Sequence, residues 1–437
     1  MAPPFRCTVK RAFGARSPMI LDGLSLIAFR IIVDFGYSYL VAGPYAYWGF
    51  KGEPSLLRIV VSWVFFLALL PLLVRVIRSE RLSARFVALL SLISLVPTTT
   101  LIANDPRYPV VYVILMFIYW LILLFSATYL PAIRIFRWVI VSDAVHLVTA
   151  GLLSAAVLYT SWKFTDFRLH FGLLDVYDLR VEARGFVMHP VLGYLGTFAD
   201  NVLPILLAYY IRRRWYLLSI FLSGVILLNF GISGSKQVIF LLLFCFISIF
   251  VSESAQINRR ITSVLAMVIF LAILERVALG TLFLGSFSMF RLFAIPAHTH
   301  WLYYDYFQGK EFVLLTQSIL KVFFESPYTD NVQFLIGEYD RGEYGGRANN
   351  GLFSDGYLNF GPSSVLFFPV ICVAIMKTLE SAAEGLSSSV RFMIVASFSL
   401  VFLSLPLTTT MLSAGVGLVI ILLPTLPRRD GGITGRC

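Results

Sequence analysis

The chain has 437 residues, of which 58% are hydrophobic and 14% charged, and its mean hydropathy is +0.83. Soluble domains are about 45–50% apolar and about 25% charged, so these figures exclude a soluble globule, and they exclude a disordered chain as well. The formal net charge of +11 favours nucleic acid binding only if the 35 Lys and Arg residues form a basic face or stripe. The composition therefore leaves a polytopic membrane protein as the class.

Apolar runs long enough to cross a bilayer recur along the chain and predict an all-α fold. A hydrocarbon core of about 30 Å needs about 20 apolar residues in a helix. We expect about twelve membrane-spanning helices in a single integral membrane domain over residues 1–437. The predicted spans are 20–42, 56–74, 86–103, 109–130, 138–160, 188–210, 215–232, 238–252, 261–284, 356–376, 391–406 and 410–426. The last two are short and close together, so one broken element is the alternative.

The basic residues predict the orientation. With the N-terminus inside, the segments that face the cytoplasm hold 20 Lys and Arg and five acids, whereas the opposite side holds 13 basic and 14 acidic residues. Cytoplasmic segments of membrane proteins are enriched in Lys and Arg. We therefore expect both termini in the cytoplasm and no nucleic acid as a partner.

Two connections on the outer side, 161–187 and 285–355, are longer than the others, and long connections in compact proteins are usually functional. In the first, residues 173–184 lack Gly and Pro and predict a short helix. Arg180 and Arg184 share one face of it, and neither has a carboxylate three or four positions away. Like charges at this spacing destabilise a helix. Acids from the other loop or an anionic ligand would compensate, and two solvated arginines are the alternative.

The second outer segment begins with aromatic residues mixed with charged and polar ones, including Arg291, His298, His300, Tyr303 and Tyr304. This mixture favours a sugar-binding or headgroup-facing surface, and an interfacial aromatic belt is the alternative. His298 and His300 point to opposite faces of a helix, so a metal pair is not expected.

The same segment ends in a stretch rich in Gly and Asn that enters a membrane helix. Asp355 and Asn359 lie four residues apart at the start of this helix, and Asn350 precedes them. Small residues at such a place let backbones or a lipid chain approach closely.

Several ionisable residues lie within the predicted spans, where they are costly and are functional hypotheses by default. Arg30 and Asp34 are four residues apart and are expected to neutralise each other. Asp200 lies within the span 188–210, and Lys236 lies in a tight outer turn between two spans.

Four short motifs resemble those of bacterial O-antigen and oligosaccharide repeat-unit polymerases of the Wzy type. They are Tyr177-Asp178-Leu179-Arg180-Val181-Glu182-Ala183-Arg184, Gly234-Ser235-Lys236, Arg291…Pro296…Tyr303-Tyr304 and Asn350-Gly351…Asp355-Gly356-Tyr357…Asn359-Phe360-Gly361. The motifs cover residues 172–376 in the expected order. Some members of this family have a glycine eleven positions after an arginine in both outer loops, and this chain lacks that pattern, so residue roles are not copied from that variant.

The resemblance implies a GT-C-like, metal-independent membrane glycosyltransferase without a cofactor. It would act at the outer face of the bacterial cytoplasmic (inner) membrane on undecaprenyl-diphosphate-linked oligosaccharides. The growing glycan would pass to the next lipid-linked repeat unit, in the biosynthesis of lipopolysaccharide O-antigen or another exopolysaccharide. Membrane lipid, a chain-length regulator and a flippase are the implied partners.

In this interpretation the two outer loops cap the active site, and three groups of residues are candidates. Guanidinium and ammonium groups bind a diphosphate and stabilise the charge that develops on it. The candidate diphosphate-binding residues are Arg180, Arg184 and Arg291, with Lys236 and Arg347 as supporting candidates. Candidate bases for the acceptor hydroxyl are Asp178, Glu182, His298 and Asp355. Candidate glycan-binding residues are Tyr177, Tyr303, Tyr304, Asn350 and Asn359.

The sequence has no Asp-x-Asp pair to clamp a metal and no Walker-type loop, so nucleotide sugars and ATP are not expected substrates. Two rival functions remain open. An O-antigen ligase would use the same donor and a different acceptor, and a flippase or transporter would need polar residues along a path through the membrane.

Overall fold

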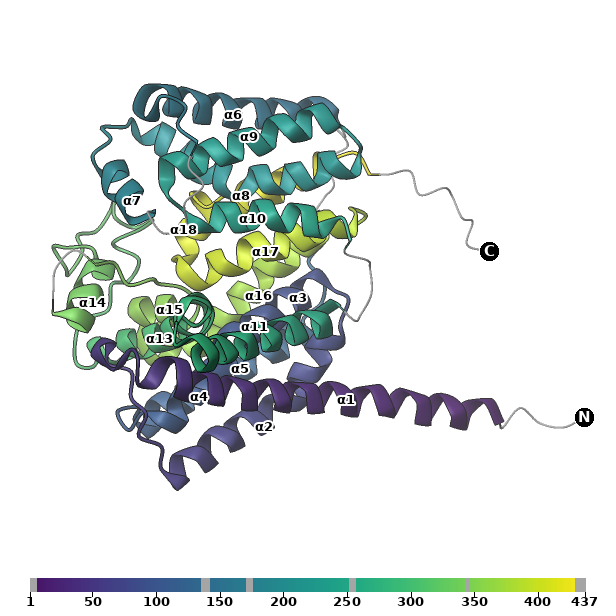
Figure 1. Cartoon of the computed structure of the whole chain (residues 1–437), viewed down its shortest axis with the longest axis vertical. Coiled ribbons are helices and arrows are strands. Elements are labelled where there is room, and N and C mark those ends of the chain that lie inside the picture. Colours follow the sequence, from purple (N-terminus) through teal and green to yellow (C-terminus); the bar gives the residue numbers. More distant parts are fainter. Residues whose placement is uncertain (1–5, 135–141, 170–175, 251–256, 343–345, 429–437) are drawn as a thin grey trace, which may run out of the picture. The chain divides into compact units, whose positions relative to one another are not determined.

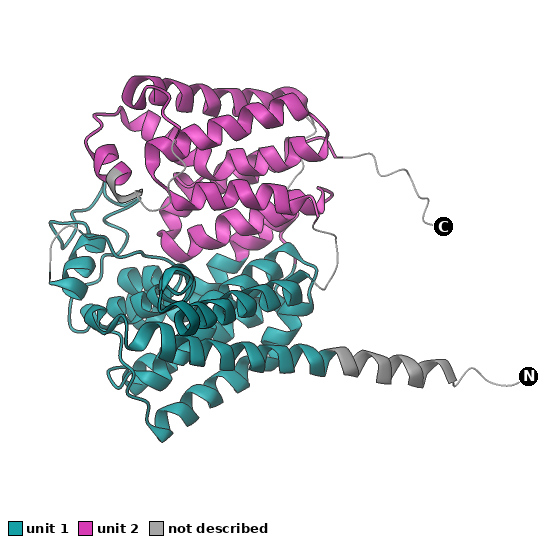
Figure 2. Ribbon diagram, viewed as in Figure 1, with its two compact units in different colours: residues 1–131, 254–373 teal, residues 132–253, 374–437 magenta. Residues whose placement is uncertain are grey.

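The computed structural model describes residues 6–134, 142–169, 176–250, 257–342 and 346–428, with side chains from residue 19 onward and, in the helix that begins at Val176, from Leu179. Across these ranges the chain is helical and has no strand, which confirms the predicted all-α fold. The chain forms two compact units, residues 1–131 with 254–373 and residues 132–253 with 374–437 (Figure 2). The single membrane domain expected from the sequence remains a prediction.

Unit 1 contains most of the helices of the first third of the chain and those of the second outer segment (Figure 1). Its α-helices are α1 (Arg6–Tyr37), α2 (Leu56–Arg78), α3 (Leu82–Leu90), α4 (Val96–Asn104), α5 (Val110–Tyr129), α11 (Ile257–Leu279), α12 (Phe283–Gly285), α13 (Ile295–Tyr306), α14 (Val332–Arg341), α15 (Phe353–Phe360) and the first part of α16 (Ser364–Ala382). Three π-helical segments are η1 (Ser38–Ala42), η3 (Ser91–Leu95) and η4 (Ser286–Ala294), and two 3₁₀ turns are η2 (Ala46–Trp48) and η5 (Gly361–Ser363).

The centre of unit 1 is the continuous helix from Leu82 to Asn104, made of α3, η3 and α4. It is predominantly apolar and almost entirely buried, as expected for a helix that neighbours surround. It packs against α1, α2, α5, α11 and α13.

A buried ion pair joins α1 to this central helix. Arg30 Nε lies 3.0 Å from Asp34 Oδ2, which confirms the predicted pairing. The fully buried guanidinium also donates to the carbonyl oxygen of Val96, at 3.0 Å, and to the hydroxyl of Thr99. A buried charge is tolerated only with such partners, so this contact fixes α1 against α4.

Unit 2 is a bundle around α8. Its elements are α6 (Asp143–Thr165), α7 (Val176–Arg184), α8 (Pro190–Arg212), α9 (Tyr216–Ser233), α10 (Lys236–Ser248), the last part of α16, α17 (Ser388–Ser404), α18 (Leu407–Leu412), α19 (Val416–Leu422) and the 3₁₀ turn η6 (Leu423–Thr425). Helices α6, α9, α10 and α17 all pack against α8 (Figure 1). The short helix α7 lies at one end of the bundle, against α9.

All twelve predicted apolar runs overlap helices, and in the described residues nine helices are long and apolar enough to cross a membrane. The other three runs fall on α1, whose described part carries Asp22 besides Arg30 and Asp34, and on the shorter helices α10 and α17, of 13 and 17 residues. A polytopic membrane protein accounts for these helices, and the number twelve stays a prediction. The last two runs are separate helices, because α17 ends before Pro406.

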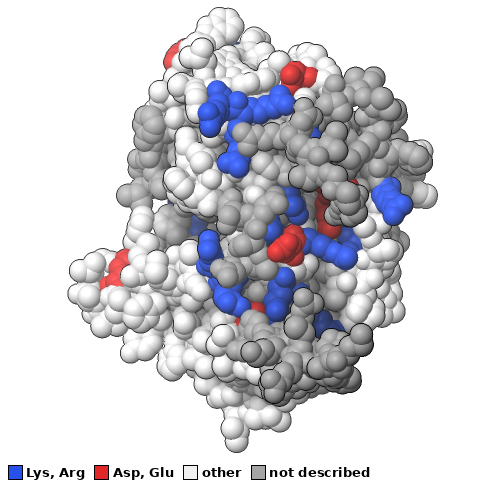
Figure 3. All heavy atoms as spheres, turned by 90° about the vertical axis from the view of Figure 1, so that its right-hand side faces the viewer, with Lys and Arg blue, Asp and Glu red and all other residues white. Residues whose placement is uncertain are grey.

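Basic residues gather at helix ends in both units. In unit 1, Arg78 ends α2 and Arg81 precedes α3, and in unit 2 the arginines 212–214 end α8. Figure 3, which views the right-hand side of Figure 1, shows many Lys and Arg and few Asp and Glu side chains. The orientation predicted from the sequence is compatible with this distribution and stays a prediction.

Candidate functional site

The turn between α9 and α10 brings two of the predicted phosphate-binding residues to one end of unit 2. Gly234 ends α9 with a φ of +58°, in the left-handed region that glycine adopts without steric cost, and α10 begins directly at Lys236. Arg180, on α7, donates from Nε to the carbonyl oxygen of Gly234 at 3.1 Å. The structure therefore confirms both the short helix and the tight turn, and joins Arg180 to the segment that carries Lys236.

The remaining predicted residues of α7 have different surroundings. Arg184 is exposed, and no ion pair to it is present in the described part of the chain. Glu182 accepts from Arg168, with 2.7 Å between Nη2 of the arginine and Oε2 of the glutamate. The side chains of Tyr177 and Asp178 lie outside the described residues, so these two candidates remain predictions.

Polar side chains of α8, α9 and α10 meet next to this turn. Asn229 Nδ2 donates to Asp200 Oδ1 at 2.6 Å, and Gln237 Nε2 donates to Asn201 Oδ1 at 3.1 Å. Asn201 and Asn229 are buried, and Asp200 is partly buried. Buried polar groups of this kind strengthen one another in a low local dielectric. They therefore join the middle of α8 to the end of α9 and the start of α10.

We call Arg180, Asp200, Asn201, Asn229, Lys236 and Gln237 the α8–α10 cluster. It combines the exposed guanidinium group of Arg180 and the ammonium group of Lys236 with one carboxylate, beside an apolar bundle. Cations fixed in such surroundings bind phosphate oxygens and stabilise charge that develops on a leaving group. The sequence missed Asn229 and Gln237, although a lone Asn inside the apolar run 225–230 was a signal.

Unit 1 holds a second group of polar residues around α13. His300 is buried, with Nε2 3.1 Å from the hydroxyl of Ser94 and Nδ1 2.7 Å from the hydroxyl of Ser354. Burial lowers the pKa of His300 to about 3, so the imidazole stays neutral at any physiological pH. It links α13 to the central helix and to α15.

His298 is also buried, on another face of α13, as its spacing from His300 predicted. Its Nδ1 lies 3.3 Å from the hydroxyl of Tyr108, and its Nε2 lies 3.5 Å from Asp340 Oδ1. Burial raises the pKa of Tyr108 well above its usual range. Both nitrogens of His298 therefore already face partners of unit 1.

Asp355 lies buried near the start of α15 with two asparagines around it. Asn359 Nδ2 is 3.1 Å and Asn350 Nδ2 is 3.5 Å from its Oδ1. Asn350 Oδ1 and the hydroxyl of Tyr303 are buried and have no hydrogen-bond partner in the described part of the chain. Unmatched buried polar atoms are costly, and they mark this place as one that a polar group of a ligand or a water would complete.

The other predicted residues of unit 1 divide between its interior and its surface. Tyr304 is buried and packs on the rings of Tyr112 and Tyr357. Arg291 and Arg347 are exposed, and Arg347 donates from Nη2 to Gln333 Oε1 at 2.6 Å. The aromatic residues expected on an outer surface thus form part of the core of unit 1, because π-helical η4 and α13 fold inward against α4.

Each unit brings a part of the predicted set together: Arg180 with the Lys236 turn in unit 2, and Asp355 with Asn350 and Asn359 in unit 1. Among the residues that the structure describes, no three or more His, Cys, Asp or Glu side chains are placed to hold a metal ion. Comparison with protein family models, with curated proteins and with solved structures finds no match to the chain.

Proposed function

We propose that this chain is a metal-independent membrane glycosyltransferase of the Wzy type, which polymerises undecaprenyl-diphosphate-linked oligosaccharide repeat units. In this proposal the enzyme has about twelve spans in a GT-C-like arrangement and lies in the bacterial inner membrane with both termini in the cytoplasm. Its site is at the outer face, and a flippase and a chain-length regulator are its partners.

The observation that carries the proposal is the hydrogen bond from Arg180 to Gly234. It holds a guanidinium group beside the turn that carries Lys236, at one end of an apolar bundle. A lipid diphosphate enters from the membrane with its charged group at the interface, and fixed Arg and Lys groups at a helix end are its natural partners.

The reaction breaks the bond between the anomeric carbon of the growing glycan and the diphosphate oxygen. The hydroxyl of the next repeat unit forms the new bond, its proton passes to a base, and undecaprenyl diphosphate leaves with the bonding electrons. Arg180, Lys236 and Arg184 stabilise the charge of this leaving group. Asp178, His298 and Asp355 stay predictions from the sequence as candidate bases, whereas the ion pair with Arg168 makes the Glu182 carboxylate less available.

The glycolipids of a deletion strain test the proposal against its rivals. We expect single repeat units on their carrier at the outer face of the inner membrane. Repeat units trapped at the inner face would identify a flippase, and polymer retained on the carrier without transfer to lipid A core would identify a ligase. Either result would overturn the proposal.

A further inference from the structure

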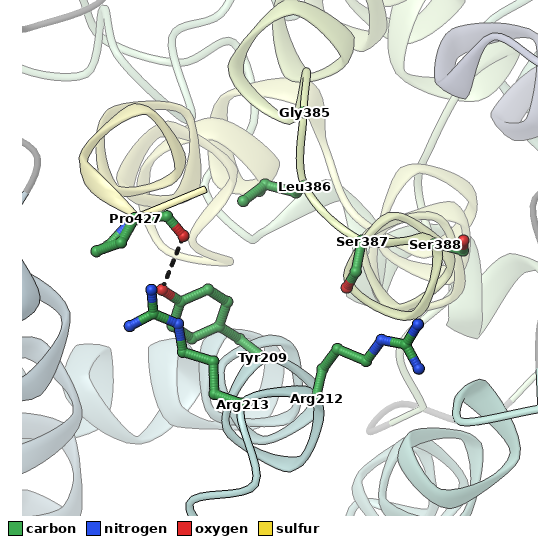
Figure 4. Close-up of a pocket in the computed structure, with 8 residues that line it drawn as sticks. All are labelled: Tyr209, Arg212, Arg213, Gly385, Leu386, Ser387, Ser388 and Pro427. Atoms are coloured by element: carbon green, nitrogen blue, oxygen red, sulfur yellow. Dashed lines mark hydrogen bonds between the residues drawn. The ribbon is translucent and has the colours of Figure 1, made fainter. Parts of the chain in front are cut away.

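A cavity of about 320 Å³ opens in unit 2 where α8 ends and α17 begins (Figure 4). It lies at the C-terminal end of α8, which runs from Pro190 to Arg212, whereas Asp200 and Asn201 of the α8–α10 cluster lie near the middle of this helix. Its walls include Tyr209, Arg212, Arg213, Ser387, Ser388 and Pro427. These side chains have no role in the proposed transferase reaction.

One wall is a rigidly held arginine. Arg213 Nη1 lies 3.0 Å from Asp143 Oδ1, and its guanidinium carbon lies 5.2 Å and 5.6 Å from the ring centres of Tyr209 and Trp215. The hydroxyl of Tyr209 in turn donates to the carbonyl oxygen of Pro427 at 3.0 Å (Figure 4). Contacts within the protein thus hold the guanidinium group of Arg213 in position without a ligand.

The second arginine has a different setting. Arg212 is exposed, and it makes no hydrogen bond or ion pair in the described part of the chain. It also lines a neighbouring cavity of about 330 Å³, whose walls combine the apolar residues Ala208, Ile211 and Ile249 with Arg214, Tyr216 and Ser389. Arg212 therefore lies between two cavities that both have polar and apolar walls.

The opposite wall of the cavity contributes hydroxyl groups that can donate hydrogen bonds, and the residues that line it include no carboxylate. Ser387 precedes α17 without capping it, and its hydroxyl points toward the space between the two arginines (Figure 4). Glu384, the acid just before the loop 385–388, already has a partner of its own. With Asp143 offsetting Arg213, the cavity keeps a net positive charge from Arg212.

We propose that this cavity binds a phosphate group. Two arginines and the hydroxyl of Ser387 line one hollow, and guanidinium and hydroxyl donors match the oxygens of a phosphate ester. Two carriers of that group fit the walls: a phospholipid headgroup, with its glycerol or acyl part over the apolar residues of the adjoining cavity, and a small soluble phosphate ester. This end of unit 2 carries the arginines 212–214 and is the one predicted to face the cytoplasm. The inference stands independently of the proposed transferase function.

The test uses the purified full-length protein in detergent, with the retention of added lipid measured by native mass spectrometry. Phosphatidylglycerol is one probe, diacylglycerol is the phosphate-free control lipid, and glycerol 3-phosphate is the soluble competitor. Arg212→Gln is the decisive variant, because its side chain is exposed and its loss should not unfold the bundle. Arg260→Gln is the matched control, since Arg260 is another exposed arginine and lines neither cavity.

We expect phosphatidylglycerol to bind in preference to diacylglycerol, and Arg212→Gln to weaken that binding about tenfold, the effect of losing one charge-assisted hydrogen bond. Arg260→Gln should bind as the unchanged protein does. If glycerol 3-phosphate displaces phosphatidylglycerol, the natural ligand is a soluble phosphate ester. If it does not, the natural ligand is the lipid. Either result supports a phosphate site. Equal binding of the two lipids, or equal weakening in both variants, would overturn it.

Discussion

Arg180 reaches from α7 to the carbonyl oxygen of Gly234, 3.1 Å from its Nε, and so ties the first outer segment to the turn between α9 and α10. The contact therefore positions the Arg180 guanidinium beside the turn that carries Lys236, which follows Gly234 by two residues.

Arg180→Ala should lower polymer formation by about two orders of magnitude, the usual effect of removing a donor to developing charge. Arg168→Ala is the matched control, because Arg168 is an arginine of the same outer segment that pairs with Glu182. Polymer ladders from cells with equal amounts of membrane-inserted protein provide the measurement. Normal ladders in Arg180→Ala would remove Arg180 from the site.

Asn229→Ala should lower the free energy of unfolding by about 1–3 kcal/mol, because it leaves the Asp200 carboxylate without the donor 2.6 Å away. Asn349→Ala, at an exposed position, should change it by less than about 0.5 kcal/mol. Thermal unfolding in detergent compares the two. Equal effects would show that the Asn229–Asp200 contact is not a structural link.

Arg30→Leu should destabilise the protein by about 3–5 kcal/mol, because it leaves Asp34 without its cation in an apolar bundle. The double variant Arg30→Leu with Asp34→Leu should recover most of this loss, since no charge then remains unpaired. A double-mutant cycle from unfolding curves measures the coupling. Additive losses would contradict a coupled intramembrane pair.

The buried His300 predicts an acid-sensitive fold. Burial lowers its pKa from 6.5 to about 3, so between these values the unfolded chain binds a proton that the folded chain excludes. Stability therefore falls as the pH drops below about 6.5, by about 1.4 kcal/mol per pH unit from this group.

This effect is measured as the change in Tm between about pH 7 and about pH 5. His300→Gln should show a smaller acid-induced decrease than the unchanged protein, because glutamine does not titrate. His189→Gln, at an exposed histidine, should leave the decrease as it was. An identical decrease in all three proteins would exclude His300 as its source.

Metal removal should leave turnover intact. The proposed leaving-group stabilisation comes from Arg and Lys side chains, and the sequence lacks an Asp-x-Asp clamp. Treatment of the purified enzyme with EDTA should therefore not change the rate at which lipid-linked repeat units are consumed. A loss that Mg²⁺ or Mn²⁺ restores would refute this part of the proposal.

The helices were predictable from the sequence because membrane spans need long apolar runs, and local spacing was enough to predict the pair of Arg30 and Asp34. The contact between Asn229 and Asp200 was not predictable from the sequence, because it depends on which helices become neighbours. The burial of Tyr303 and His300 was also missed. Aromatic and polar residues near a membrane suggest a surface, and only packing against α4 and α15 shows that they belong to the interior.

The central claim is tested most directly with purified protein in proteoliposomes that contain synthetic undecaprenyl-diphosphate-linked repeat units and no other enzyme. We predict a ladder of glycans that differ by one repeat unit, with one undecaprenyl diphosphate released per unit added, and loss of both products in Arg180→Ala. Repeat units that stay single in the presence of folded, unchanged protein would contradict the assignment as a polymerase.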